Sequence, residues 1–166
     1  MAPRRDQSIN EELALEQPME DVRHEAVLNI VRTANVLSVQ GAQLFRQYGL
    51  TEAQFNVLFA LKYKQRAWTQ ADLGRRLVVT RASITSVLDK LEEKGLVARN
   101  HVPGNRRIHH VELTKPGRAL ADEVEDRYRQ DIHAVLGEMS DTACRRLVHM
   151  LEQVRAGAAV LLDSGD

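Results

Sequence analysis

The side chains best suited to chemistry lie between Thr69 and Leu113, and that chemistry is hydrogen bonding to phosphates and base edges. A helix predicted to begin after Thr80 carries small polar groups and one arginine in its first turns. Small side chains let a backbone approach a polyanion closely, and arginine bonds bidentately to guanine or phosphate. Thr69 and Gln70 open the preceding predicted helix, where N-terminal amides suit phosphates. This stretch therefore predicts a nucleic-acid-reading unit.

A basic hairpin is predicted beyond this helix. Arg106 and Arg107 directly follow a turn at residues 103–105. The potential of a narrow minor groove favours inserted arginine. A solvated basic turn is the alternative, but the position of the pair beyond a helix-turn-helix favours DNA. The predicted DNA contacts are Thr69, Gln70, Thr80, Arg81, Ala82, Ser83, Thr85, Ser86, Lys90, Arg106 and Arg107.

The distribution of charge supports this prediction, although the whole chain has a formal net charge of zero. Between Lys62 and Arg118 the sequence holds thirteen Lys/Arg and five Asp/Glu, a net of +8. The remainder holds ten basic and eighteen acidic residues, a net of −8. Such asymmetry is expected where one region meets phosphates.

Hydrophobic spacing predicts the elements that must position these groups. Pro18 is expected to open a long helix, Thr51 and Gln54 form a capping-box pattern, and Gly95 is a helix stop. The predicted helices span residues 18–49, 51–64, 69–77, 80–95, 114–139 and 140–160. The predicted strands span 96–99 and 108–113, with a strand of one or two residues at 67–68. The expected buried faces are Phe55, Leu58, Phe59 and Leu61 in the second helix, and Ile84, Val87, Leu88 and Leu91 in the fourth.

Composition narrows the class of protein. Aromatic residues make up only 4% of a chain that is 43% hydrophobic, so the core is expected to be aliphatic and helical. One cysteine excludes an internal disulfide. We expect a soluble, cytoplasmic protein without a membrane partner, because the sequence shows no signal peptide or apolar span.

The segments TQADLGRRLVVTRASITSVLDKLEEKGLVARN and GNRRIHHVELTKPG resemble the MarR family of bacterial transcription regulators. The resemblance covers about residues 22–162. It implies a winged-helix homodimer whose first, fifth and sixth helices interlock between subunits. It also implies binding to a pseudo-palindromic operator, usually repression, often relieved by a small ligand such as a phenolic acid. Asn105 departs from the Asp-x-Arg usual at the wing tip and loses an ion pair that could orient the arginine.

The expected fold is therefore mainly α with a small two- to three-stranded β-wing, a winged helix-turn-helix. Residues 1–17 form a flexible arm, 18–50 and 115–163 a helical dimerisation region, and 51–114 the DNA-binding lobe of one compact chain. The dimer is also expected because the first, fifth and sixth helices carry stripes of apolar residues, which together are more apolar surface than one small winged-helix module can cover. A two-fold dimer would set two recognition helices about 34 Å apart, matching half-sites one helical turn apart.

A ligand pocket is expected where the long helices meet the lobe. Aromatic side chains and a cation there would suit an aromatic carboxylate, although these residues could equally be ordinary core or surface positions. The predicted pocket residues are His24, Phe55, Arg66, Trp68 and His109.

Other chemistry is expected to be absent. His109 and His110 are neighbours on a strand and point to opposite faces, so no metal site is predicted. Cys144 lies on an apolar stripe and is expected to be a buried hydrophobe. No cofactor or catalytic motif is recognisable, so no enzyme activity is predicted. The alternatives that remain open are a metal- or redox-responsive regulator of the same fold and a winged-helix protein-interaction module.

Overall fold

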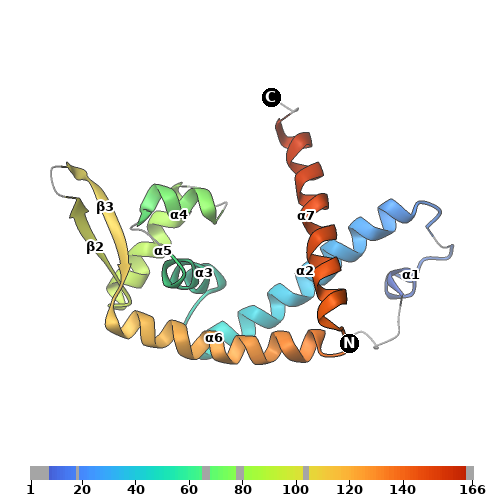
Figure 1. The fold of residues 1–166 in the computed structure, drawn as a ribbon, viewed down its shortest axis with the longest axis horizontal. Helices are drawn as coiled ribbons and strands as arrows, with labels where there is room; N and C mark the ends of the chain where they lie inside the picture. Colours follow the sequence, from blue (N-terminus) through green and yellow to red (C-terminus); the bar gives the residue numbers. More distant parts are fainter. Residues whose placement is uncertain (1–7, 18, 65–67, 78–80, 103–104, 164–166) are drawn as a thin grey trace. The chain divides into compact units, whose positions relative to one another are not determined.

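A computed structural model describes residues 8–17, 19–64, 68–77, 81–102 and 105–163. The fold consists of helices and a small antiparallel sheet of strand order β1-β3-β2, so the predicted fold class is confirmed (Figure 1). The chain divides into two compact units, Met1–Ala121 and Asp122–Asp166. The elements are α1 (Ile9–Glu12), α2 (Val22–Gln47), α3 (Glu52–Lys62), β1 (Trp68–Thr69), α4 (Gln70–Arg76), α5 (Arg81–Glu93), β2 (Val97–Val102), β3 (Asn105–Leu113), α6 (Lys115–Leu136) and α7 (Asp141–Asp163).

The helix starts follow side-chain caps. Thr51 and Gln54 form the predicted capping box of α3, with the Gln54 amide donating to Thr51 Oγ1 at 3.2 Å. The predicted start of α2 was wrong, because Asp21 is its cap and accepts from the Arg23 amide at 2.9 Å. Pro18 itself lies outside the described residues.

A short helix, α1, lies within the predicted arm. The Ser8 cap and the Glu11 side chain form a capping box, and Ile9 is buried. The Glu12 carboxylate accepts from Arg32 of α2 at 3.0 Å. Sequence reasoning missed this helix because a single turn is too short to show a hydrophobic period.

The core of the first unit joins α2, α3, α4, α5 and the sheet. Phe45 of α2 stacks on Phe55 of α3 with ring centroids 4.2 Å apart. Phe59 was expected to be buried but is 40% exposed, because it lies on the outer side of α3. The fully buried side chains include Leu58, Leu61, Leu73, Ile84, Leu88, Leu91 and Val111.

The wing hairpin is longer than predicted. β2 and β3 pair from Val97 opposite Leu113 to Val102 opposite Asn105, with an irregularity between His101 and Val102. The sequence prediction ended both strands near their last apolar residues, whereas the backbone pairing of β2 and β3 continues through polar residues such as Asn100 and His101. The short β1 pairs Trp68 with Val111, which confirms the strand predicted there. Ala67 and the turn residues 103–104 lie outside the described residues.

Tight contacts fix the base of the wing. Gly95 ends the last turn after α5 with φ +68°, in the left-handed region that favours glycine. The hydroxyl of Thr114 donates to the Gly95 carbonyl at 2.6 Å and accepts from the Gly117 amide at 3.1 Å. The start of α6 is thus hydrogen-bonded directly to the end of the turn that follows α5.

The second unit contains the rest of α6 and α7. Ser140 caps α7 as predicted, accepting from the Ala143 amide at 3.3 Å. Cys144 is half-buried rather than buried. Large apolar side chains on these helices are exposed in the single chain, namely Ile132, Val135, Val148, Met150, Val154 and Val160.

Within the described part of the chain, none of the helices combines the length and apolar character that crossing a membrane requires.

Candidate nucleic-acid interface

The polar and apolar sides of α5 are clearly divided. Ser83, Ser86 and Lys90 are exposed and Thr85 is half-buried. Buried Ile84 and Leu88 hold the opposite side of the helix against the core. Thr80 lies outside the described residues; Arg81 and Ala82 begin α5, but their side chains are not described.

A hydrogen bond joins the two helices of the helix-turn-helix. The Gln70 side-chain amide, at the first residue of α4, donates to Thr85 Oγ1 of α5. Two of the predicted DNA contacts are therefore brought together, and the first residue of α4 is joined to the second turn of α5.

The polar groups of Thr69 are used in the capping box at the start of α4. Its amide and hydroxyl donate to Asp72 Oδ2 at 2.9 and 2.8 Å, and its hydroxyl accepts from the Asp72 amide at 3.2 Å. Hydrogen bonds from the backbone and then the hydroxyl of Thr69 lower the pKa of Asp72, with a smaller contribution from Arg75. The capping box therefore stabilises α4 at neutral pH; this contribution is complete above the ordinary pKa of an aspartate and is lost as the pH falls from there through the lowered pKa.

Arg99 of β2 connects the wing to α5. Its Nη2 lies 2.7 Å from Asp89 Oδ1 and its Nη1 lies 2.9 Å from Glu92 Oε2. Its backbone amide donates to Glu92 Oε1 at 3.2 Å, and Nη2 donates to the Thr85 carbonyl at 3.4 Å. The sequence predicted neither this contact nor its role, because the strand and the helix meet only in the fold.

The predicted wing arginines stand at the start of β3. Asn105, Arg106 and Arg107 are its first three residues, and their side chains are not described. Further along the hairpin the rings of His101 and His109 lie 4.4 Å apart. The hairpin is therefore a paired ladder as far as Asn105 rather than an irregular basic loop.

A lysine at the base of the wing, Lys64, is hydrogen-bonded to the sheet. Lys64 Nζ donates to the Val111 carbonyl at 2.7 Å. Burial lowers the pKa of Lys64, and the nearby Glu112 carboxylate acts in the opposite sense. This cation therefore holds the sheet rather than offering charge to a ligand.

The described residues of the predicted pocket each have different neighbours. His24 is exposed on α2, whereas Phe55 is packed on Phe45 in the core. Trp68 lies under the Arg76 guanidinium, 4.5 Å from the ring centre, and His109 lies beside His101. Arg66 lies outside the described residues.

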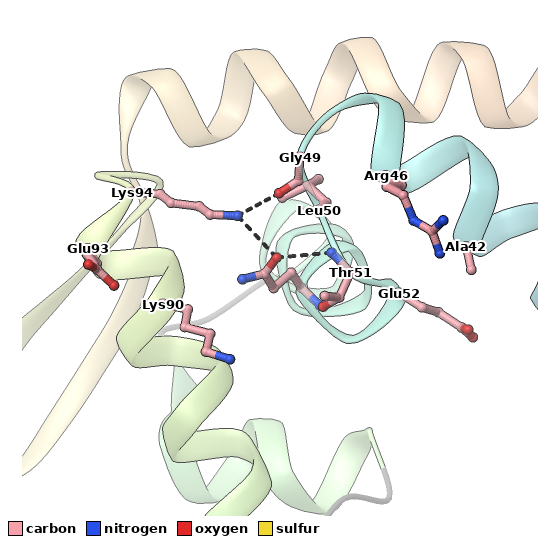
Figure 2. Close-up of a pocket in the computed structure, with 10 residues that line it drawn as sticks. Ala42, Arg46, Gly49, Leu50, Thr51, Glu52, Lys90, Glu93 and Lys94 are labelled. Atoms are coloured by element: carbon pink, nitrogen blue, oxygen red, sulfur yellow. Dashed lines mark hydrogen bonds between the residues drawn. The ribbon is translucent and has the colours of Figure 1, made fainter.

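A pocket lies elsewhere, where the end of α2, the start of α3 and the end of α5 meet. Its volume is about 920 Å³. Figure 2 shows Lys94 reaching from the α5 end toward the α2–α3 turn, where Nζ donates to the Gly49 carbonyl at 2.6 Å and to Gln54 Oε1 at 3.4 Å. The lining residues are Ala42, Arg46, Gly49, Leu50, Thr51, Glu52, Gln54, Lys90, Glu93 and Lys94.

The charges around this pocket are mixed. Arg46, Lys90 and Lys94 are cationic, and Glu52 and Glu93 are acidic. Glu52 is engaged by the Ser38 hydroxyl at 2.8 Å. Sequence reasoning missed the pocket because its residues come from three elements; the helix stop at Gly49 and the cap at Thr51 were its only local signals. No group of three or more His, Cys, Asp or Glu that could hold a metal occurs among the residues whose placement the structure gives.

Comparisons with known proteins agree with this architecture. The sequence profile of the MarR family matches residues 50–109. The HTH-type transcriptional repressor YetL of Bacillus subtilis is 32% identical over 120 residues, covering 72% of each chain. A MarR/EmrR family transcriptional regulator from Acinetobacter sp. ADP1 superposes with a TM-score of 0.73 at 19% identity, covering 84% of this chain and 98% of that one.

A third similar protein is BpsR of Bordetella bronchiseptica. Its structure superposes with a TM-score of 0.63 at 27% identity, covering 76% of this chain and 98% of that one. That structure concerns the mechanism by which 6-hydroxynicotinic acid regulates DNA binding by BpsR.

Proposed function

This chain belongs to the MarR family of transcription regulators, and we propose that it is a homodimeric, sequence-specific DNA-binding repressor released by a small ligand. The observation that carries the proposal is the division of α5. Buried Ile84 and Leu88 anchor one side, and exposed Ser83, Ser86 and Lys90 occupy the other. A helix of this kind fits the major groove and presents short polar groups to base edges.

The wing supplies the second proposed contact. Arg106 and Arg107 start the strand that returns from the wing turn, in a region of local net positive charge. Arginines in this position suit the minor groove beside the base pairs that α5 reads. Reading by α5 together with anchoring by the wing would give both sequence preference and affinity.

Binding to the DNA upstream of its own coding region tests the proposal. In a gel shift at moderate salt, we expect a discrete complex that survives an excess of unrelated competitor DNA. Equal affinity for the upstream fragment and the competitor would contradict sequence-specific binding.

Replacing both wing arginines should weaken binding and flatten its dependence on salt. We expect Arg106→Ala combined with Arg107→Ala to lower the slope of log K against log salt by about one for each phosphate that the variant no longer neutralises. Fluorescence anisotropy over a range of salt concentrations measures this slope. Exposed Arg23→Ala at the start of α2 is the matched control, and an unchanged slope in the wing variant would remove the wing from the interface.

The proposed homodimer accounts for the exposed apolar side chains outside the DNA-reading lobe. In α2 these include Val22, Val27, Val31 and Leu37, and α7 carries a second set. Exposed apolar surface of this extent marks an interaction site in a soluble protein. Light scattering coupled to size exclusion should give twice the mass of the chain; a monomer at micromolar concentration would contradict the dimer.

We place the proposed effector in the pocket at the α2–α3 turn. The BpsR precedent and the cations Arg46, Lys90 and Lys94 favour an aromatic carboxylic acid. A ligand carboxylate would compete with the Gly49 carbonyl for Lys94 Nζ, which now links the end of α5 to that turn. An acid held by Lys94 between the α2–α3 turn and the end of α5 would shift α5 and so weaken DNA binding.

Replacing Lys94 should uncouple the effector from DNA. We expect Lys94→Met to bind operator DNA within about threefold of wild type, yet to need at least about tenfold more 6-hydroxynicotinic acid or salicylate for release. Exposed Lys115→Met is the control. If equal concentrations of these acids release wild type and Lys94→Met from operator DNA, the effector binds elsewhere. The pocket predicted from the sequence, formed by His24, Phe55, Arg66, Trp68 and His109, is then the next to test.

A further inference from the structure

The side chain of Arg99 is held between the wing and the DNA-reading helix. Only 19% of the side chain is exposed, although it belongs to the wing hairpin. It reaches two carboxylates of α5, those of Asp89 at 2.7 Å and Glu92 at 2.9 Å. Glu92 also accepts from the Arg99 backbone amide at 3.2 Å, so a single residue binds both of its oxygens.

Stability alone does not account for this arrangement. The desolvation cost of burying a guanidinium can exceed what its attraction to paired carboxylates returns. The Nε of Arg99 is buried and lacks a hydrogen-bond partner among the atoms the structure describes, which adds to that cost. An apolar residue at this strand position would avoid both costs, so the guanidinium is better explained by what it does to α5.

The first effect on α5 is electrostatic. Asp89 and Glu92 follow the polar first turns of the helix, and their side chains are 56% and 41% exposed. Carboxylates at these positions would repel the phosphates of a bound duplex. A guanidinium between them offsets part of that repulsion and draws both side chains toward the wing.

The second effect is geometric. Nη2 of Arg99 donates to the Thr85 carbonyl at 3.4 Å, and the Thr85 hydroxyl accepts from Gln70 of α4. One connected set of hydrogen bonds therefore joins α4, α5 and β2. The two elements proposed to enter adjacent grooves are held at a fixed separation by this set.

We infer that Arg99 is a positioning residue for DNA recognition: it neutralises Asp89 and Glu92 and fixes α5 against the wing. The inference rests on the proposed DNA-binding function. Arg99 acts through α5 and is not itself required to touch DNA.

Variants of the charge cluster test the inference. We expect Arg99→Gln to bind the upstream DNA at least tenfold more weakly than wild type in fluorescence anisotropy. Adding Asp89→Asn and Glu92→Gln to that variant removes the charges that Arg99 offsets and retains hydrogen-bonding side chains. This triple variant should recover binding to within about threefold of wild type, a rescue that a purely structural role would not produce. Thermal unfolding of each variant reports folding independently.

The outcomes separate this inference from the proposed function. If wild type binds no DNA specifically, the proposed function fails. If wild type binds and Arg99→Gln binds equally well, or the folded triple variant stays as weak as Arg99→Gln, the inference alone is overturned. If Arg99→Gln does not fold, Arg99→Lys replaces it in the test. A loss of less than tenfold in DNA affinity, with an unchanged slope of log K against log salt, supports the role of the charge. A larger loss in affinity overturns it.

Discussion

Gly117→Ala should destabilise the fold by about 3 kcal/mol or more, at or above the upper end of the usual cost of overpacking. A Cβ at this position would lie 1.8 Å from the Leu96 carbonyl oxygen and 2.8 Å from its carbon. Both atoms are backbone, so no side-chain rotation relieves the clash. The Leu96 carbonyl also accepts from the Thr114 amide at 3.1 Å, so the wing base and the start of α6 must separate.

Chemical denaturation of wild type and variant measures this effect. Gly157→Ala in α7 is the matched control, because no heavy atom lies within 4 Å of its added Cβ. Alanine is favoured over glycine in a helix, so the control should be neutral or more stable by about 0.5–1 kcal/mol. Equal stability of Gly117→Ala and wild type would show that α6 does not approach Leu96 this closely.

Ser86→Asp should abolish specific DNA binding while leaving the fold intact. Ser86 is exposed on the side of α5 opposite to buried Leu88. A carboxylate introduced there faces the phosphates and base edges in the proposed complex, and like charges at an interface cost several kcal/mol. The expected loss in affinity is about 100-fold or more, since about 1.4 kcal/mol corresponds to tenfold.

Asn56→Asp controls for the added charge. Asn56 is exposed on α3 and lies outside the predicted DNA contacts. Anisotropy titrations should place its affinity within about threefold of wild type, and both variants should unfold at the wild-type temperature within a few degrees. Unchanged binding by Ser86→Asp would mean that this side of α5 does not enter the groove.

Local features of the fold could be predicted from the sequence. The capping box at Thr51, the cap at Thr69 and the stop at Gly95 depend on residues within one helical turn of each other. The buried stripe of α5 follows from the helical spacing of apolar residues. These signals were sufficient for the fold class and for the order of the helix-turn-helix and wing.

Features that join distant elements could not be predicted. Arg99 meets Asp89 and Glu92 because β2 packs against α5, and the pocket needs three elements. The strand ends were also missed, since backbone pairing continues through polar residues such as Asn100 and His101. The roles assigned to the DNA-contact residues remain predictions, and for Arg81, Arg106 and Arg107 the side chains are not described.

Hydroxyl-radical footprinting of the upstream DNA tests recognition by a two-fold dimer most directly, because it reports specificity and two-fold geometry together. We predict two protected stretches of related sequence, centred about one helical turn apart, with two chains bound per site. Ser86→Asp should remove both stretches at the same protein concentration. Uniform protection along the fragment, or a single protected stretch bound by one chain, would contradict a dimer that reads DNA through two winged helices.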